Sequence, residues 1–294
     1  MTVLQYFNDL ASRLNLTETQ VEGVSKSRDG ILAALQGSPR ISLIYQKPSF
    51  YTGSYSRETI IRPLDDIDLY IRIDYSLHAK NKNPKEIMLL FMHALKKSFP
   101  DTPIKLSPPC IEVSFFLKRF EIVPVVPYQD NDDIYDIPSA DLNRWEQCYP
   151  NLPNKWLTMA NRRNGGLFIP LIKMVKQWIR NSNLRKPIKS FHVELLIDRV
   201  FFEYRIENYP TGIYRWLYAT HELFQHNDKP FVVEPEGYEY VDDYLYRKPM
   251  LLKIFKAKIN DGLRLSDMAI KYWNKGHEGP AVAIFKKLFG TPSK

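Results

Sequence analysis

Cysteine is scarce in this chain of 294 residues: Cys110 and Cys148 are the only two, and they lie far apart in the sequence. A disulfide framework needs paired cysteines, and a zinc site needs clustered Cys and His, whereas the six histidines here are scattered. Free thiols are typical of a reducing compartment. We therefore expect a cytoplasmic protein without a zinc site.

Long hydrophobic runs are also missing. The sequence has no run of about 18 apolar residues, so no membrane span and no membrane partner are expected. The N-terminal stretch from Met1 to Leu10 is amphipathic and lacks a basic start followed by an apolar core, so it does not have the pattern of a signal peptide. Internal repeats and low-complexity segments are not visible, which leaves a globular chain long enough for two modest lobes.

The chain carries a formal net charge of +8, and 44% of its residues are hydrophobic. The hydrophobic content is normal for a globular protein. The basic charge suits binding of polyphosphates and would equally suit nucleic acid. Charge alone does not decide between these two ligand classes.

Two motifs carry the chemistry of the sequence. A Gly53-Ser54 turn precedes a segment in which apolar residues alternate with Asp66 and Asp68. The alternation predicts a strand over residues 66–73 with both carboxylates on the same face. An Asp-x-Asp pair alone is usually a solvated strand face or a turn, but the upstream turn favours a ligand. Gly53 permits close backbone approach, Ser54 offers a hydroxyl and amide donors to phosphate oxygens, and paired carboxylates are typical Mg²⁺ ligands.

The run Gly53-Ser54-Tyr55-x-Arg57-x-Thr59 followed by Asp66-Ile67-Asp68 resembles the polymerase-β-like nucleotidyltransferases, and within them the cGAS/DncV-like enzymes of bacterial anti-phage signalling. That family has a third carboxylate, usually Asp, on a neighbouring strand before a hydrophobic-Val-Pro run. Here Glu121 stands at this position, a departure that keeps the carboxylate but adds one methylene, so the family's detailed metal geometry does not carry over directly. The resemblance implies that Asp66, Asp68 and Glu121 are catalytic and hold two Mg²⁺ or Mn²⁺ ions.

Downstream segments extend the resemblance over about residues 40–290. A helix with Lys176 shortly before Trp178 and a Lys-Ser-Phe-x-x-Glu-Leu start at Lys189 both match family elements, and they imply that Lys176 and Ser190 bind the triphosphate. Lys176 is otherwise an exposed helix lysine, and Ser190 is otherwise a plain N-cap. Asn164 is the candidate for tuning base choice, and Glu112 is interpreted as a surface or supporting carboxylate.

The organisation predicted from the sequence is an α+β, bilobal, polymerase-β-like fold. Residues 1–145 form a catalytic lobe with N-terminal helices, residues 146–294 form a helical lobe, and the active site lies in the cleft between them. We expect a helical break near Thr17 and an amphipathic helix over 84–99. Strands over 111–117 and 120–125 are joined by a hairpin at Lys118-Arg119, residues 127–153 form a loop, and later helices cover residues near 170–180, 190–200, 210–225, 247–260, 262–274 and 278–289.

The resemblance implies an enzyme that joins NTPs, ATP among them, into a cyclic di- or trinucleotide, which activates a downstream effector; a regulatory protein partner is also implied. Two alternatives remain open. A template-independent enzyme that extends an RNA end would use the same carboxylates, and it is the one reading that includes RNA as a partner. A catalytically inactive nucleotide- or RNA-binding module is disfavoured because all three carboxylates are present.

Overall fold

The computed structural model describes residues 1–44, 46–64, 66–74, 76, 83–116, 118–128, 131–185, 187–235, 237 and 239–292. The chain forms two compact units. The sheet unit comprises Leu16–Glu58 and Leu64–Asn154, and the helical unit comprises Met1–Asn15, Thr59–Pro63 and Lys155–Lys294. The first helix therefore groups with the C-terminal helices, although its place in the sequence put it in the predicted catalytic lobe over residues 1–145.

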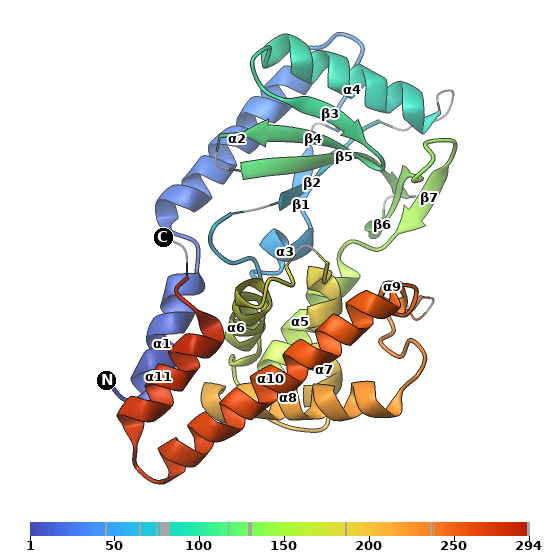
Figure 1. Ribbon diagram of the computed structural model, residues 1–294. Coiled ribbons are helices and arrows are strands. Elements are labelled where there is room, and N and C mark those ends of the chain that lie inside the picture. Colours follow the sequence, from blue (N-terminus) through green and yellow to red (C-terminus); the bar gives the residue numbers. More distant parts are fainter. Residues whose placement is uncertain are drawn as a thin grey trace. The chain divides into compact units, whose positions relative to one another are not determined.

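The elements of the sheet unit follow the chain in the order shown in Figure 1. Its helices and strands are α2 (Glu18–Gln36), β1 (Ser49–Tyr51), α3 (Gly53–Ser56), β2 (Asp66–Arg72), α4 (Pro84–Ser98), β3 (Ile104–Ser107), β4 (Cys110–Phe115), β5 (Lys118–Tyr128), β6 (Asn131–Pro138) and β7 (Trp145–Cys148). The strands are ordered β1-β2-β5-β4-β3, with β6 pairing to both β5 and β7. β2 and β5 are parallel, and the other strand pairs are antiparallel.

One face of this sheet is covered by α2 and α4, which pack against each other (Figure 1). The predicted alternation in β2 is confirmed, because Ile67, Leu69 and Ile71 are fully buried and belong to the same core as residues of both helices. Thr17 explains the predicted break: its side chain caps α2 in a reciprocal capping box with Gln20. With its apolar residues in the core, β2 presents Asp66 and Asp68 on the opposite face.

Two sequence predictions in this unit are wrong. The stretch over 127–153 is not a loop, since it contains β6 and β7; its Asp, Asn and Pro content suggested a loop, but Tyr135 is buried against Val125 and fixes the strand. The hairpin does not turn at Lys118-Arg119 either. Both residues are already in β5, where Lys118 pairs with Phe115 and Arg119 with Ser114.

The helical unit contains α1 (Val3–Leu14), α5 (Leu152–Arg163, whose first residues belong to the sheet unit), α6 (Phe168–Asn181), α7 (Ser190–Phe201), α8 (Tyr209–His226), α9 (Asp243–Tyr246), α10 (Pro249–Asn274) and α11 (Glu278–Phe289). α1 lies beside α6 and α11, and α10 packs along α8 and α11 (Figure 1). Among the described residues, no helix combines the length and the apolar character needed to cross a membrane.

The two helices predicted over 247–260 and 262–274 are one continuous helix, α10. Gly262 lies inside it, and a Cβ built there would come within 3.1 Å of both Leu217 and the Trp178 indole. The glycine therefore serves close helix packing instead of ending a helix.

Candidate active site

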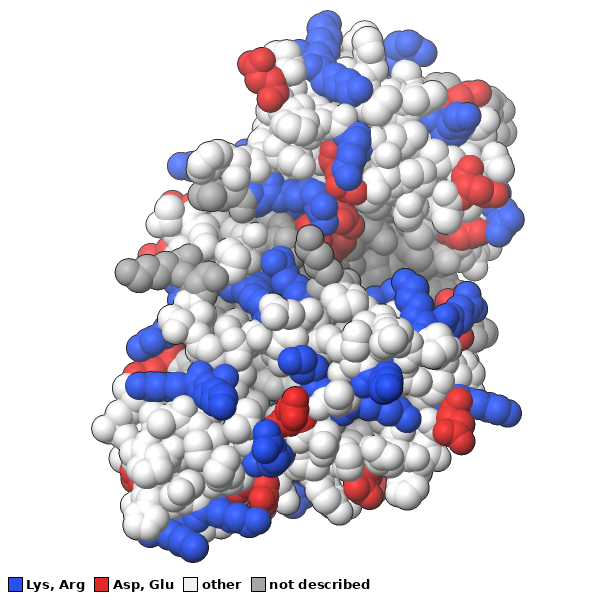
Figure 2. All heavy atoms as spheres, viewed as in Figure 1, with Lys and Arg blue, Asp and Glu red and all other residues white. Residues whose placement is uncertain are grey.

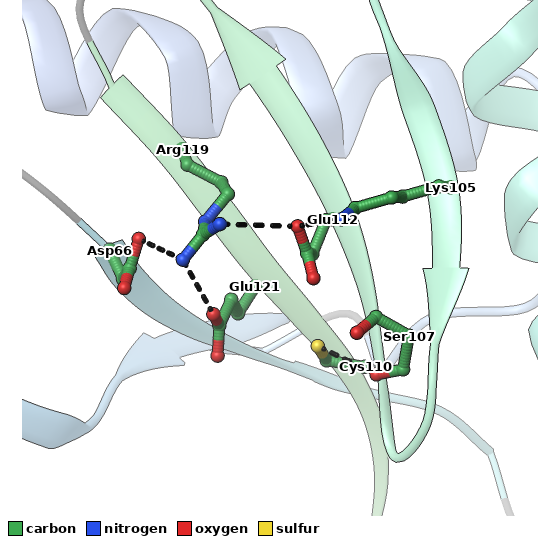
Figure 3. Close-up of polar contacts among 7 residues, drawn as sticks. All are labelled: Asp66, Lys105, Ser107, Cys110, Glu112, Arg119 and Glu121. Carbon is green, nitrogen blue, oxygen red and sulfur yellow. Dashed lines mark hydrogen bonds and ion pairs between the residues drawn. The ribbon is translucent and has the colours of Figure 1, made fainter. Parts of the chain in front are cut away.

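The register of three adjacent strands brings the carboxylates together. β2 and β5 place Asp68 directly opposite Glu121, and Asp66 opposite Arg119. β4 then places Glu112 opposite Glu121 on the far side of β5. Partners in register point to the same face of a sheet, so the prediction that Glu121 lies beside the aspartate strand is confirmed (Figure 3).

Gly53 lies against the carboxylate of Asp68. It begins α3 with a φ of 63°, and a Cβ added to it would sit 1.7 Å from Asp68 Oδ2. The backbone is held there because the Thr52 amide donates a hydrogen bond to the Asp68 carbonyl at 3.0 Å. The Gly-Ser turn and the Asp-x-Asp strand are therefore one structural feature, and Ser54 follows directly in the same short helix.

Replacing Gly53 with alanine tests this contact. The added methyl group would displace the Asp68 carboxylate or the turn, so we expect a loss of about 10²-fold in catalytic activity, the usual cost of a misplacement near 1 Å. Steady-state rates would be measured beside a Gly237→Ala control, which also adds a Cβ at a positive φ but, among the described residues outside its chain neighbours, meets no atom within 4 Å. Equal losses in both variants would contradict the proposed contact.

Burial and the neighbouring negative charges disfavour the ionised forms of Glu121 and Asp68. Burial raises the pKa of Glu121 to about 7, and the neighbouring charges of Asp68 and Asp66 add to the rise. Burial also raises the pKa of Asp68, with Arg57 opposing the rise and Asp66 reinforcing it. A positive charge near these two carboxylates would stabilise their ionised forms.

Arg119 supplies such a charge, and the sequence analysis missed it. Its Nη2 lies 2.6 Å from Asp66 Oδ1 and 3.5 Å from Glu121 Oε1, while its Nη1 lies 3.4 Å from Glu112 Oε2 (Figure 3). The only signal in the sequence was spacing. Arg119 lies two residues before Glu121, and in a strand two such residues point to the same face of the sheet. Assigning Arg119 to a turn hid that signal.

Glu112 is not a surface residue. Its side chain is only 9% exposed and is held by Lys105 at 3.1 Å as well as by Arg119. The alternative interpretation, that it supports the site from the side, agrees with these contacts.

The donor set suits a hard divalent cation in kind, since Asp66, Asp68 and Glu121 offer carboxylate oxygens from two paired strands. As the described residues are arranged, however, no group of three or more His, Cys, Asp or Glu side chains is close enough to hold a metal ion. The guanidinium of Arg119 is the cation that contacts Asp66 and Glu121 in this conformation.

Lys176 lies in the interior of the helical unit. Its Nζ contacts Glu194 Oε1 at 2.6 Å and donates hydrogen bonds to the carbonyl and the hydroxyl of Thr59, both at 3.0 Å. Lys176 is 8% exposed, and Glu194 and Thr59 are fully buried. The interpretation of Lys176 as an exposed helix lysine is therefore wrong, and its binding to a triphosphate remains a prediction.

Ser190 and Asn164 occupy different environments in the same unit. Ser190 is exposed and is the first residue of α7, one position after the N-cap residue Lys189, so the N-cap interpretation is wrong. Asn164 is 3% exposed; its amide nitrogen donates to the Ala160 carbonyl, and its oxygen accepts from the Ile206 amide. These two bonds connect the backbone at Ala160 to the backbone at Ile206. A role for Asn164 in base choice remains a prediction.

Residues 1–161, more than half of the chain, match the family model of the Second Messenger Oligonucleotide or Dinucleotide Synthetase domain. The chain belongs to this family. It is thus a nucleotidyltransferase related to cyclic oligonucleotide synthases, and the resemblance to the cGAS/DncV-like enzymes is confirmed.

Two curated proteins are similar to this chain over nearly its whole length. A cyclic AMP-AMP-AMP synthase from Acinetobacter sp. is 24% identical over 99% of this chain and 85% of its own length. A probable cyclic nucleotide synthase from Bacillus cereus is 24% identical over 97% of this chain and 95% of its own length.

Solved structures of cyclic nucleotide synthases share the fold. Escherichia coli CdnC in complex with HORMA-deltaN has a TM-score of 0.73 at 18% identity, covering 99% of this chain and 98% of that one. Vibrio cholerae DncV bound to the linear intermediate 5' pppA(3',5')pG also has a TM-score of 0.73, at 13% identity, covering 100% and 97%. The predicted α+β nucleotidyltransferase fold is confirmed.

Proposed function

We propose that the chain joins NTPs, ATP among them, into a cyclic di- or trinucleotide second messenger. The observation that carries the proposal is the contact of Gly53 with Asp68, together with the pairing of Asp68 and Glu121 across β2 and β5. The choice of ATP is supported by the related cyclic AMP-AMP-AMP synthase and by the structural neighbour CdnC bound to ATP.

In the proposed reaction a ribose hydroxyl loses its proton to solvent and its oxygen forms a bond to the α-phosphorus of an NTP, while the bond from that phosphorus to the pyrophosphate leaving group breaks. Asp66 and Asp68 would hold two Mg²⁺ or Mn²⁺ ions, and Glu121 would hold the ion on the nucleophile side. Such ions lower the pKa of the attacking hydroxyl and neutralise the leaving group. The same chemistry repeats, once more for a dinucleotide and twice more for a trinucleotide, and the last bond formed closes the ring.

The chain's remaining candidate residues would bind the substrate. Gly53 and Ser54 would present backbone amides and a hydroxyl to phosphate oxygens beside Asp68. Ser190 has an exposed hydroxyl at the first turn of α7, where helix amides favour anions. Lys176 would bind a phosphate only after breaking its contact with Glu194. Asn164 would affect base choice indirectly, by fixing the backbone at Ala160 and Ile206.

The cellular role we propose is anti-phage signalling, in which the cyclic product activates a separate effector protein. The CdnC structure that this chain resembles is a complex with a HORMA protein. That complex supports a regulatory protein partner here as well.

The competing function is extension of an RNA end, which the net charge of +8 does not disfavour. Figure 2 shows Lys and Arg side chains spread over the visible face, with Asp and Glu among them. A basic surface of this kind attracts RNA in a strongly salt-dependent way, whereas a nucleotide pocket responds less to salt.

Incubation with labelled NTPs and Mg²⁺, with and without RNA, separates the two functions. We expect product from NTPs alone, and we expect it to resist phosphatase because a ring has no terminal phosphate. The mass of the product would give the ring size. Phosphatase-sensitive ladders that form only when RNA is added would replace the proposed function with RNA-end extension.

A further inference from the structure

The guanidinium of Arg119 lies where a metal ion would need to bind. It contacts Asp66 Oδ1 at 2.6 Å and Glu121 Oε1 at 3.5 Å, and both carboxylates are ligands in the proposed function. A bound Mg²⁺ needs carboxylate oxygens at about 2.0–2.1 Å. If the same carboxylate oxygens bound both the metal ion and Arg119, the two cations would lie only a few ångströms apart and would repel each other.

Arginine suits this position because its guanidinium remains charged at any working pH. With Arg119 in place, the repulsion between Asp66 and Glu121 is partly compensated in the absence of metal. The side chain is 39% exposed, so it has solvent beside it and room to move.

Glu112 offers Arg119 a second position. Its Oε2 already lies 3.4 Å from Arg119 Nη1, and its side chain is 9% exposed. The strand register places Glu112 and Arg119 diagonally across β4 and β5, on the same face. Glu112 is not one of the proposed metal ligands, so its bond to Arg119 can persist or strengthen when Asp66 and Glu121 turn to a metal.

We propose that Arg119 is a positioning residue that occupies the carboxylate site in the metal-free enzyme and retracts onto Glu112 when divalent cations bind. It thereby sets the metal concentration at which the site assembles. The inference rests on the proposed function for the identity of the ligands. Arg119 competes with the metal for those ligands, and Glu112 is its second carboxylate partner; neither residue belongs to the sequence motifs.

The two residues then have opposite effects on metal affinity. Arg119→Met removes the competitor and should tighten Mn²⁺ binding about tenfold, the low end for one charge-assisted hydrogen bond because the Arg119 side chain is 39% exposed. Glu112→Gln weakens the retracted position and should loosen Mn²⁺ binding several-fold. A purely structural role for Arg119 would give weaker binding in both variants, because the carboxylates would lose their arrangement.

The experiment is a titration of the metal-free full chain with Mn²⁺ alone, by calorimetry, without nucleotide. Arg144→Gln is the matched control: it also removes one arginine charge from the sheet unit, but Arg144 pairs with Glu146 in an exposed ion pair. This variant should bind Mn²⁺ as the wild type does. Arg119→Lys keeps the charge but loses the two-nitrogen geometry of the guanidinium, so its Mn²⁺ affinity should lie between those of the wild type and Arg119→Met. This variant replaces Arg119→Met in the test if Arg119→Met does not fold.

Each outcome has a clear meaning. Unchanged or weaker Mn²⁺ binding in Arg119→Met and Arg119→Lys, with binding still abolished by Asp66→Asn, overturns the inference and leaves the proposed metal ligands in place. Binding in the wild type that Asp66→Asn does not reduce overturns both, because Asp66 would then not be a ligand. Tighter binding in Arg119→Met with looser binding in Glu112→Gln supports the two-position account.

Discussion

Asp68→Asn should reduce synthesis of the proposed cyclic product by at least about 10³-fold, a loss near 4 kcal/mol in transition-state stabilisation. The carboxylate lies at the centre of the site, against Gly53 and opposite Glu121. Asparagine keeps the shape of the side chain but loses the charge. Product formation quantified with labelled ATP would measure the loss. Glu146→Gln, in β7 with its side chain 43% exposed, is the control and should keep full activity.

Asp68→Asn should also change how the stability of the metal-free protein depends on pH. Glu121 has a folded-state pKa of about 7, above its ordinary value of 4.5, so the metal-free protein loses stability as pH rises from about 4.5 to about 7. Asp68→Asn removes one of the charges that raise this pKa, so the loss should be smaller in the variant. Melting temperatures in chelator from pH 5 to pH 8 would test this. A steeper loss in the variant would contradict the proposed repulsion.

Lys176→Met should destabilise the helical unit by about 3–5 kcal/mol, because it leaves the fully buried carboxylate of Glu194 without its cation. Urea unfolding followed by tryptophan fluorescence suits the measurement, since four of the five tryptophans, all except Trp145, lie in this unit. Lys271→Met, which breaks an exposed ion pair with Asp267 on α10, should change stability little.

A second variant separates a structural role of Lys176 from a role in phosphate binding. Lys176→Met combined with Glu194→Leu removes both charges and should recover much of the lost stability. If Lys176→Met unfolds at the same urea concentration as the wild type but binds NTPs more weakly, the lysine acts on the triphosphate and the buried pair is not its main role.

The strand patterns could be predicted from the sequence because they are local. Alternating apolar residues around Asp66 and Asp68 decide which face is buried, and the run after Glu121 marks the neighbouring strand. What the sequence could not supply were contacts between distant residues. Nothing near Lys176 in the sequence indicates Thr59, and Arg119 reads as part of a turn until the register of β4 and β5 is known.

The strands β6 and β7 and the continuous helix α10 were missed for a related reason. Their local composition favours a loop in the first case, and two helices over 247–260 and 262–274 were predicted in the second, whereas packing decides otherwise. Tyr135 is buried in the sheet unit, and Gly262 lets α10 approach Trp178 and Leu217 closely. Tertiary packing overrides local propensity at both positions.

An anomalous difference map from crystals grown with Mn²⁺ and a non-reactive ATP analogue would test the central claim most directly. The account predicts two manganese peaks about 3.5–4 Å apart. Both should be bound by Asp66 and Asp68, with Glu121 on one of them and Arg119 turned toward Glu112. Manganese peaks elsewhere in the chain, or an analogue bound without metal at Asp66 and Asp68, would contradict it.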